Sequence, residues 1–391
     1  MLAFLWAEDS ETELRSELAE SFPDAQVRSA HGSLFEVDSD IRSGVRLPYL
    51  VFARQMLPNA RRAQAKSIRE WAGELFEAIA GVLPDNQPWS VHIEPHYGAR
   101  TTPRMGARAW HSARREQSAE NRVSSVKTGH FVEGLASNVD AEAGRQRCRL
   151  IREAFVEILR KKRRHLLRQL RAEPAPFTSE DSQAQLLLTA PDAGYISVAA
   201  APMPFEQRHL LSPFPKGDMP AATDKLAPSR AFAKLVEAEL RLGYAIRAGE
   251  TCVDLGASPG SWTYIAAGRG ARVIAVDRSP LREDLMRSPK VRFQEGDAFS
   301  FRPERSVDWL LCDVIAAPER TAELLLEWLR RDWCRNFVVT VKLKADTGTD
   351  VLGKLKRELP LLTRELFLTK LCANKREICM FGTRATCQAI P

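Results

Sequence analysis

The sequence predicts an α/β protein with two unlike halves: a doubly wound, mostly parallel sheet after about residue 222, preceded by an α+β half. Two observations predict this division. After Ser229, strand-like and helix-like segments alternate to the end of the chain, which is typical of a parallel sheet with helices on both faces. Before it, short strands and longer amphipathic helices follow one another without regular alternation. A chain of 391 residues is also long enough for two or three domains.

In the first half, apolar spacing predicts helices over residues 11–21 and 65–82. It predicts strands at 34–37, 49–53 and 89–93, and a strand pair at 185–189 and 195–200. Residues 98–140 lack periodicity and are expected to form a long basic loop. Residues 145–171 place apolar side chains at helical spacing beneath an Arg/Lys face, which predicts a basic helix.

The second half contains the alternating elements in a clear order. Helices are predicted at 231–242, 260–268, 321–331 and 350–359. Strands are predicted at 251–255, 272–276, 291–295, 309–312 and 336–342, with a closing pair at 365–371 and 378–382. Prolines between Pro202 and Pro220 indicate a stiff linker. We therefore expect a small α+β domain (1–60), a second region (61–203), the linker (204–221) and the sheet domain (222–391).

Composition narrows the class of protein. With 44% hydrophobic and 27% charged residues the chain is of ordinary globular composition, and it contains no apolar run long enough to span a membrane. The N-terminus lacks a basic stretch and leads into acidic residues, so we do not expect a secretory signal. We expect a cytoplasmic protein instead. Seven cysteines without a Cys-x-x-Cys pair indicate neither a disulfide framework nor structural zinc, and no metal site is predicted.

The positive charge is concentrated in the predicted basic helix. Residues 145–171 contain eleven Lys or Arg and two acids, a balance of +9, whereas the whole chain carries +7, so the remainder is −2. Such a segment favours a polyanionic partner, with RNA as the main candidate, although a solvated helix face is the plain alternative. The predicted RNA-binding residues are Arg160, Lys161, Lys162, Arg163 and Arg164.

Acids and glycines follow three successive strands of the second half. The predicted cofactor-binding residues are Asp254, Gly256, Ser258, Pro259, Gly260, Ser261 and Trp262 after the first strand, Asp277 after the second and Asp297 after the third. The glycines allow a tight turn into a helix N-terminus, and Asp277 stands at the spacing that commonly grips ribose hydroxyls. Each acid alone would often be a helix cap. Together, and without Gly-x-Gly-x-x-Gly, they favour S-adenosylmethionine over a nicotinamide dinucleotide.

Four further charged residues are predicted at the same end of the sheet: Lys234, Asp313, Lys342 and Glu377. With their flanking residues they resemble the Lys-Asp-Lys-Glu tetrad of the FtsJ class of ribose 2'-O-methyltransferases. The stretches 47–55, 262–264, 301–303 and 332–335 further resemble the RlmM-type enzymes of that class, which methylate a cytidine ribose in bacterial large-subunit (23S) ribosomal RNA. The resemblance is close over residues 205–384 and looser before them.

The resemblance implies a Rossmann-like class I methyltransferase domain. It also implies a THUMP RNA-binding domain in the N-terminal half, with residues from about 60 to 200 as its counterpart. Two positions differ from the usual family pattern: the chain has Ser258-Pro259-Gly260-Ser261 in place of Cys-Pro-Gly-Gly, and Ala231 in place of serine. Both differences fall on the cofactor side of the expected site.

Methyl transfer to a ribose hydroxyl requires removal of the hydroxyl proton. Lysine, with an ordinary pKa of about 10.4, is protonated at neutral pH, but a neighbouring cation and burial both favour its neutral form. We therefore predict Lys342 as the proton acceptor, Lys234 as its like-charge partner that positions the hydroxyl, and Asp313 and Glu377 as orienting groups. Asp313 is also expected near the methionine end of the cofactor. Lys344 lies on the same face of the strand as Lys342, and only the family pattern selects Lys342.

Other chemistries fit the sequence less well. Exocyclic-amine methyltransferases need an Asn/Asp-Pro-Pro-Tyr/Phe loop after the fourth strand, and cytosine C5 enzymes need a nucleophilic cysteine, whereas Cys312 lies within an apolar strand. Two rival readings remain: a catalytically inactive methyltransferase-like RNA-binding or ribosome-assembly factor, and a nicotinamide-dependent oxidoreductase. The favoured expectation is 2'-O-methylation of a ribosomal RNA ribose, with that RNA or its precursor as partner and neither a membrane nor an obligate protein partner.

Overall fold

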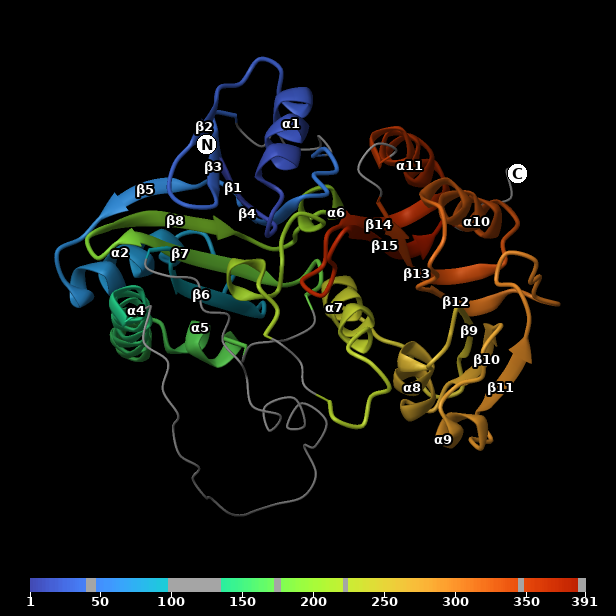
Figure 1. The fold of residues 1–391 in the computed structure, drawn as a ribbon. Helices are drawn as coiled ribbons and strands as arrows, with labels where there is room; N and C mark the ends of the chain where they lie inside the picture. Colours follow the sequence, from blue (N-terminus) through green and yellow to red (C-terminus); the bar gives the residue numbers. More distant parts are fainter. Residues whose placement is uncertain (40–46, 98–134, 172–176, 221–223, 344–347, 386–391) are drawn as a thin grey trace, which may run out of the picture.

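The computed structural model describes residues 1–39, 47–97, 135–171, 177–220, 224–343 and 348–385. Two four-stranded sheets form the N-terminal half, and one seven-stranded sheet with its helices forms the C-terminal half (Figure 1). The predicted α/β class with a mostly parallel C-terminal sheet is therefore confirmed. None of the described helices is long and apolar enough to cross a membrane.

The first sheet has the strand order β2-β3-β1-β4 and pairs its neighbours antiparallel. Its strands are β1 (Leu2–Trp6), β2 (Val27–Ser29), β3 (Leu34–Val37) and β4 (Ala53–Leu57). Helix α1 (Glu11–Ser21) begins with two acids in its first turn, which favours a helix N-terminus, and buries Leu14 and Leu18 against the sheet. The predicted helix 11–21 and strand 34–37 are confirmed.

The predicted strand at 49–53 is wrong, because β4 begins only at Ala53. Residues 49–52 form a turn whose backbone amides are satisfied elsewhere: the N–H groups of Val51 and Phe52 both donate to the Glu17 carboxylate at 3.1 Å. Tyr49 and Val51 are buried in the core of the C-terminal sheet domain. The apolar run therefore reflects burial between the two halves and not strand pairing.

The second sheet has the order β5-β8-β7-β6, in which β6 and β7 run parallel and the other pairs antiparallel. Its strands are β5 (Arg61–Gln64), β6 (Trp89–Pro95), β7 (Ser182–Ala190) and β8 (Ala193–Ala199). Helix α2 (Ile68–Ala80) is capped by Ser67, whose hydroxyl accepts from the Glu70 N–H at 3.2 Å. The predicted helix 65–82 and strands 89–93, 185–189 and 195–200 are confirmed within a few residues.

The basic segment differs from prediction at both ends. Helix α4 (Leu135–Lys162) begins ten residues before Arg145, so the predicted loop does not extend to residue 140, and residues 98–134 lie outside the described part. The helix also breaks at Arg163, and α5 (Arg164–Gln169) follows. The break lets the Leu166 carbonyl accept from the Trp89 indole N–H at 2.7 Å, which ties α5 to the edge strand β6.

The proline-rich segment is packed rather than extended. It contains α6 (Phe205–Arg208) and a 3-10 turn η1 (Pro215–Gly217), and it buries Leu210, Leu211 and Phe214. The Gln55 side chain accepts from the Ser212 N–H at 2.8 Å, so the segment is bonded to β4. The division into four domains remains a proposal.

The C-terminal sheet has the order β11-β10-β9-β12-β13-β15-β14, with β15 running antiparallel to both of its neighbours. The strands are β9 (Thr251–Leu255), β10 (Arg272–Asp277), β11 (Val291–Glu295), β12 (Val307–Cys312), β13 (Cys334–Lys342), β14 (Thr363–Thr369) and β15 (Glu377–Arg384). The order turns back between β9 and β12, and in open sheets ligands bind at the carboxyl ends of the strands at such a point.

Helices cover both faces of this sheet (Figure 1). They are α7 (Phe232–Leu242), α8 (Ser261–Gly268), α9 (Glu283–Met286), α10 (Pro318–Arg330) and α11 (Gly348–Leu362). Side chains of α10 and α11 pack on one face, and those of α7 and α8 on the other. The predicted strands and helices after Ser229 are confirmed in their order, and the structure adds the short helix α9, which was not predicted.

Ion pairs join the two halves near the edge strand β14. Lys356 of α11 pairs with Glu17 of α1 at 2.7 Å, and Arg208 of α6 pairs with Glu365 of β14 at 3.2 Å. The Lys370 N–H also donates to the Val51 carbonyl at 2.9 Å. The N-terminal half thus covers an edge that would otherwise expose unpaired backbone groups.

Candidate functional site

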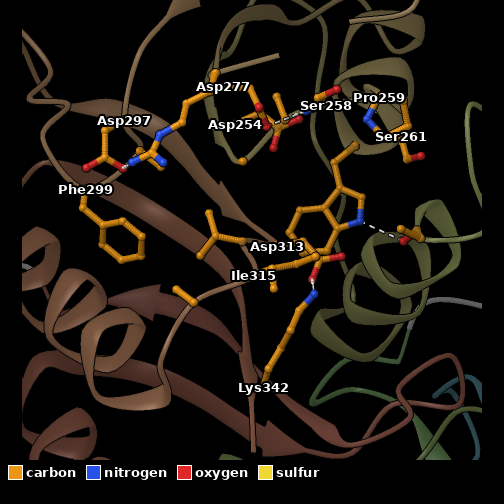
Figure 2. Close-up of a pocket in the computed structure, with 18 of the residues that line it drawn as sticks. Asp254, Ser258, Pro259, Ser261, Asp277, Asp297, Phe299, Asp313, Ile315 and Lys342 are labelled. Carbon is orange, nitrogen blue, oxygen red and sulfur yellow. Dashed lines mark hydrogen bonds and ion pairs between the residues drawn. The ribbon is translucent and has the colours of Figure 1, made fainter. Parts of the chain in front are cut away.

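A cavity of about 590 Å³ opens at the carboxyl ends of β9, β10, β12 and β13. Figure 2 shows Asp254, Asp277 and Ser258 toward one end of it, Lys342 at the other and Asp313 between them. The predicted site residues that line the cavity are Asp254, Gly256, Ser258, Pro259, Ser261, Trp262, Asp277, Asp297, Asp313 and Lys342. The cavity therefore brings the predicted cofactor residues together with Asp313 and Lys342 of the tetrad, whereas Lys234 and Glu377 do not line it.

The turn between β9 and α8 depends on two glycines. Gly256 has φ +75°, and a Cβ there would lie 2.5 Å from Cγ1 of Val314. Gly260 has φ +109° and forms the N-cap of α8 rather than lining the cavity, and a Cβ there would lie 2.3 Å from Cδ1 of Leu285. Both positions thus need glycine for conformation and for space.

Asp277 is held in place by backbone groups. Its Oδ2 accepts from the Ser258 N–H at 3.0 Å, and its Oδ1 accepts from the Ser279 N–H at 2.9 Å. Because each carboxylate oxygen can accept a second hydrogen bond, both remain able to receive ribose hydroxyls. The geometry suits the role predicted for this residue.

Asp254 is buried near the end of β9, with 2% of its surface exposed. Its Oδ2 accepts a hydrogen bond from the Thr263 hydroxyl at 2.7 Å. Burial raises its pKa to about 7, against the opposing effect of the Thr263 hydrogen bond. The group therefore titrates near neutral pH, unlike an ordinary aspartate.

Asp297 faces two arginines at the cavity rim. Arg278 lies 3.4 Å and Arg320 3.3 Å from its carboxylate oxygens. The Arg320 guanidinium also stacks over the Phe299 ring, 4.0 Å from its centroid. Arg278, Phe299 and Arg320 all line the cavity, and sequence reasoning missed them because rim positions carry no periodic signal.

The four tetrad residues come together at one end of the cavity. Lys234 on α7 lies 3.1 Å from Oδ2 of Asp313 and 2.5 Å from Oε1 of Glu377. Lys342, the last residue of β13, lies 4.0 Å from Asp313 and 3.9 Å from Glu377, so the two carboxylates are shared between the two lysines. The pairing of Lys342 with Glu377 follows from the antiparallel register of β13 and β15.

The two lysines differ in environment. Lys234 has 7% of its side chain exposed, whereas Lys342 has 31% exposed and lines the cavity. Burial by itself lowers the pKa of Lys234, but Asp313 and Glu377 together outweigh burial and raise it above its ordinary value. Lys234 is therefore a permanent cation, and Lys342 is the lysine that reaches the cavity.

Two of the residues that depart from the family pattern, Ala231 and Ser261, lie at the starts of α7 and α8, which hydrogen bonds join. The Ser261 hydroxyl is 2.7 Å from the Ser229 hydroxyl, and the Trp262 indole N–H donates to the Ala231 carbonyl at 2.8 Å. Ser261 is buried and its hydroxyl is partnered, so the extra side chain is accommodated. The start of α7 and the start of α8 are thereby bonded together beside the cavity.

The predicted RNA-binding residues lie at the end of α4 and the start of α5. Arg160 pairs with Glu157, Lys162 lies 5.0 Å from the centroid of the Phe76 ring, and Arg163 donates to the Ala80 carbonyl at 3.3 Å. Lys161 and Arg164 are exposed and form no ion pair with any residue the structure describes. Some of the cations of the basic face thus make contacts within the protein, and the others face solvent.

Lys344, the rival to Lys342, lies outside the described residues. Within those residues, no group of three or more His, Cys, Asp or Glu side chains is arranged to hold a metal ion.

Comparison with known proteins gives matches over the same region. A family model described as FtsJ-like methyltransferase matches residues 227–356, a range that contains every residue lining the cavity. The crystal structure of TrmN from Thermus thermophilus aligns with 98% of this chain and 99% of its own at 16% identity, but its TM-score of 0.28 is too low to support a functional comparison.

Curated relatives extend the match beyond that domain. The ribosomal RNA large subunit methyltransferase M of Halorhodospira halophila is 39% identical over 248 residues, which cover 63% of this chain and 68% of that protein. The protein of the same name from Azoarcus sp. is 41% identical over 138 residues, 34% of this chain and 38% of its own length. The chain therefore belongs to the ribosomal RNA large subunit methyltransferase M family and is an S-adenosylmethionine-dependent methyltransferase.

Proposed function

We propose that this protein transfers a methyl group to the 2'-hydroxyl of a ribose, expected to be that of a cytidine, in large-subunit (23S) ribosomal RNA. The observation that carries the proposal is the arrangement of Lys234, Asp313, Lys342 and Glu377 around one end of the cavity. The relatives' names support ribosomal RNA as the substrate. A cytoplasmic location is expected because the ribosome is assembled there in bacteria.

The residues present fit S-adenosylmethionine, which supplies an electrophilic methyl group on a sulfonium when bound. Gly256 leaves room for a ligand to approach the turn after β9, and Asp277 presents two fixed carboxylate oxygens beside it. We assign ribose binding to Asp277 and close backbone approach to the turn from Gly256 to Ser261. Asp297, held beside Arg278 and Arg320, would contact the adenine edge.

In the proposed mechanism Lys342 accepts the proton of the ribose 2'-hydroxyl as the oxygen attacks the methyl carbon. The bound cofactor would supply the methyl group and would keep the electron pair of its carbon–sulfur bond on sulfur, so the transfer needs no further reactant. Lys234 makes the shorter contacts to both carboxylates, so its ammonium offsets part of their charge, and Lys342 lies only 3.9–4.0 Å from them. This looser hold leaves Lys342 free to exchange a proton with the substrate.

RNA binding is proposed for the basic face at the end of α4 and the start of α5. Lys161 and Arg164 are its most available cations, since their charges have no partner within the described ranges. The second sheet with α2, α4 and α5 occupies the part of the chain implied to be THUMP-like, and it places this face on the N-terminal half (Figure 1). That half would hold the RNA while the cavity receives the target nucleotide.

The test is methyl transfer from labelled S-adenosylmethionine to large-subunit ribosomal RNA that lacks its own ribose methylations, followed by nucleoside mass spectrometry. We expect 2'-O-methylcytidine. A different methylated nucleoside would refute the ribose acceptor. RNA binding without any cofactor binding by calorimetry would instead establish the inactive RNA-binding factor.

A further inference from the structure

One exposed apolar side chain stands in the wall of the cavity. Among the described residues five large hydrophobic side chains are exposed: Val82, Leu226, Met286, Ile315 and Leu361. Of these, Ile315 lines the cavity, and it is 89% exposed, more than any of the others. Ligand pockets are lined mainly by apolar side chains that contact the ligand, so an exposed apolar side chain in the cavity wall is available for such a contact.

The position of Ile315 in the sheet separates it from the cofactor turn. The proposed cofactor residues follow β9, β10 and β11, whereas Lys342 ends β13. Ile315 follows β12, which lies between β9 and β13, and it comes two residues after Asp313. It therefore stands at the boundary between the cofactor side and the acceptor side, and Figure 2 draws it among the lining residues with Asp313 and Lys342.

The residues around Ile315 provide the packing of this loop, and the Ile315 side chain takes no part in it. Val314 is 7% exposed and lies beneath Gly256, so it supports the cofactor turn. Pro318, at the first position of α10, is buried and anchors the other end of the loop. Phe299, an aromatic residue that also lines the cavity, is already covered by the Arg320 guanidinium. Among the described residues that line the cavity, Ile315 is thus the large apolar side chain that is exposed.

We infer that Ile315 packs against the base of the target nucleotide and so positions its ribose for attack. The inference rests on the proposed function, because the ribose that reaches Lys342 brings its own base into the acceptor side of the cavity. A base offers a flat, largely apolar face that a branched aliphatic side chain can cover, as apolar residues do in other nucleotide pockets. Ile315 would then be a positioning residue that acts on RNA and not on the cofactor.

The test compares Ile315→Ala, Ile315→Asp and Ile315→Val with the wild type, using the same ribosomal RNA and labelled S-adenosylmethionine. Leu361→Ala is the matched control, since Leu361 is 80% exposed on α11 and does not line the cavity. For Ile315→Ala we expect the KM for RNA to rise about tenfold, from loss of buried aliphatic carbons. Ile315→Asp should raise it further, and Ile315→Val should stay within about twofold of wild type.

The cofactor dissociation constant, measured by calorimetry, should stay within about twofold of wild type in all of these variants, because the contact is to RNA. An unchanged KM for RNA in both Ile315→Ala and Ile315→Asp would overturn the inference. If the cofactor dissociation constant rose together with the KM for RNA, the inference would also be overturned, because Ile315 would then contact the cofactor. Absence of transfer by the wild type would instead refute the proposed function, and this inference with it.

Discussion

The buried Asp254 gives a prediction about stability whose sign and size follow from its surroundings. Its pKa is raised from 3.8 to about 7, chiefly by burial. In the unfolded chain the group ionises near its ordinary pKa, so between these two values the native state binds more protons than the unfolded state. The contribution of Asp254 to the free energy of unfolding is therefore fully present at low pH and is lost as pH rises toward 7.

Replacing Asp254 by Asn removes the titration but keeps an oxygen that can accept from the Thr263 hydroxyl. Since each pKa unit corresponds to about 1.36 kcal/mol, the rise from pH 5 to pH 8 costs the wild type about 3 kcal/mol that the variant does not lose. Asp254→Asn should thus gain stability over the wild type by about 3 kcal/mol between pH 5 and pH 8.

The assay is urea unfolding of the full chain, followed by tryptophan fluorescence at pH 5 and pH 8. Other buried acids with raised pKa, such as Glu17 and Glu239, titrate in both proteins and cancel in the difference. Asp254→Ala is the control, because it also removes the charge but leaves the Thr263 hydroxyl without its acceptor. A difference between wild type and Asp254→Asn that is the same at both pH values would refute the reasoning.

Two further predictions concern binding. Gly256→Ala should weaken cofactor binding at least about tenfold, because φ at Gly256 is +75° and the new Cβ would lie 2.5 Å from Val314. Calorimetry measures the dissociation constant of the cofactor, and Gly73→Ala is the control, because a Cβ at this helical glycine meets nothing within 4 Å. The double variant Lys161→Ala and Arg164→Ala should lower the slope of log affinity against log salt by about 1.4 for single-stranded RNA, at about 0.7 per phosphate contact. Fluorescence titration at several salt concentrations measures it, and an unchanged slope would argue for a merely solvated helix face.

The sequence predicted the C-terminal sheet well because its strands are short apolar runs bounded by acids and glycines. Thr251–Leu255 and Val291–Glu295 match their predicted ranges, Asp277 is the last residue of β10, and Asp297 comes two residues after β11. Parallel strands buried on both faces leave a strong local signal, and strand-end residues necessarily share one edge. The cavity could therefore be located before the fold was known.

The remaining features depend on tertiary contacts that local patterns do not record. Residues 49–52 look like a strand, yet they form a turn because Glu17 and the C-terminal core satisfy them. The break at Arg163 follows from the Trp89 contact with Leu166, 77 positions away in sequence. Ile315 could not be singled out from the sequence, because its unusual property is the exposure of its side chain and not its residue type.

The most direct test of the account is the methyl-transfer rate of Lys342→Ala on ribosomal RNA, with the cofactor dissociation constant measured on the same preparation. Lys290→Ala, an exposed lysine away from the cavity, serves as the control. The account predicts a rate about 10²- to 10⁴-fold lower with cofactor affinity nearly unchanged, because a positioned proton acceptor is lost while the cofactor contacts remain. A Lys342→Ala protein that still transfers methyl groups near the wild-type rate would contradict it.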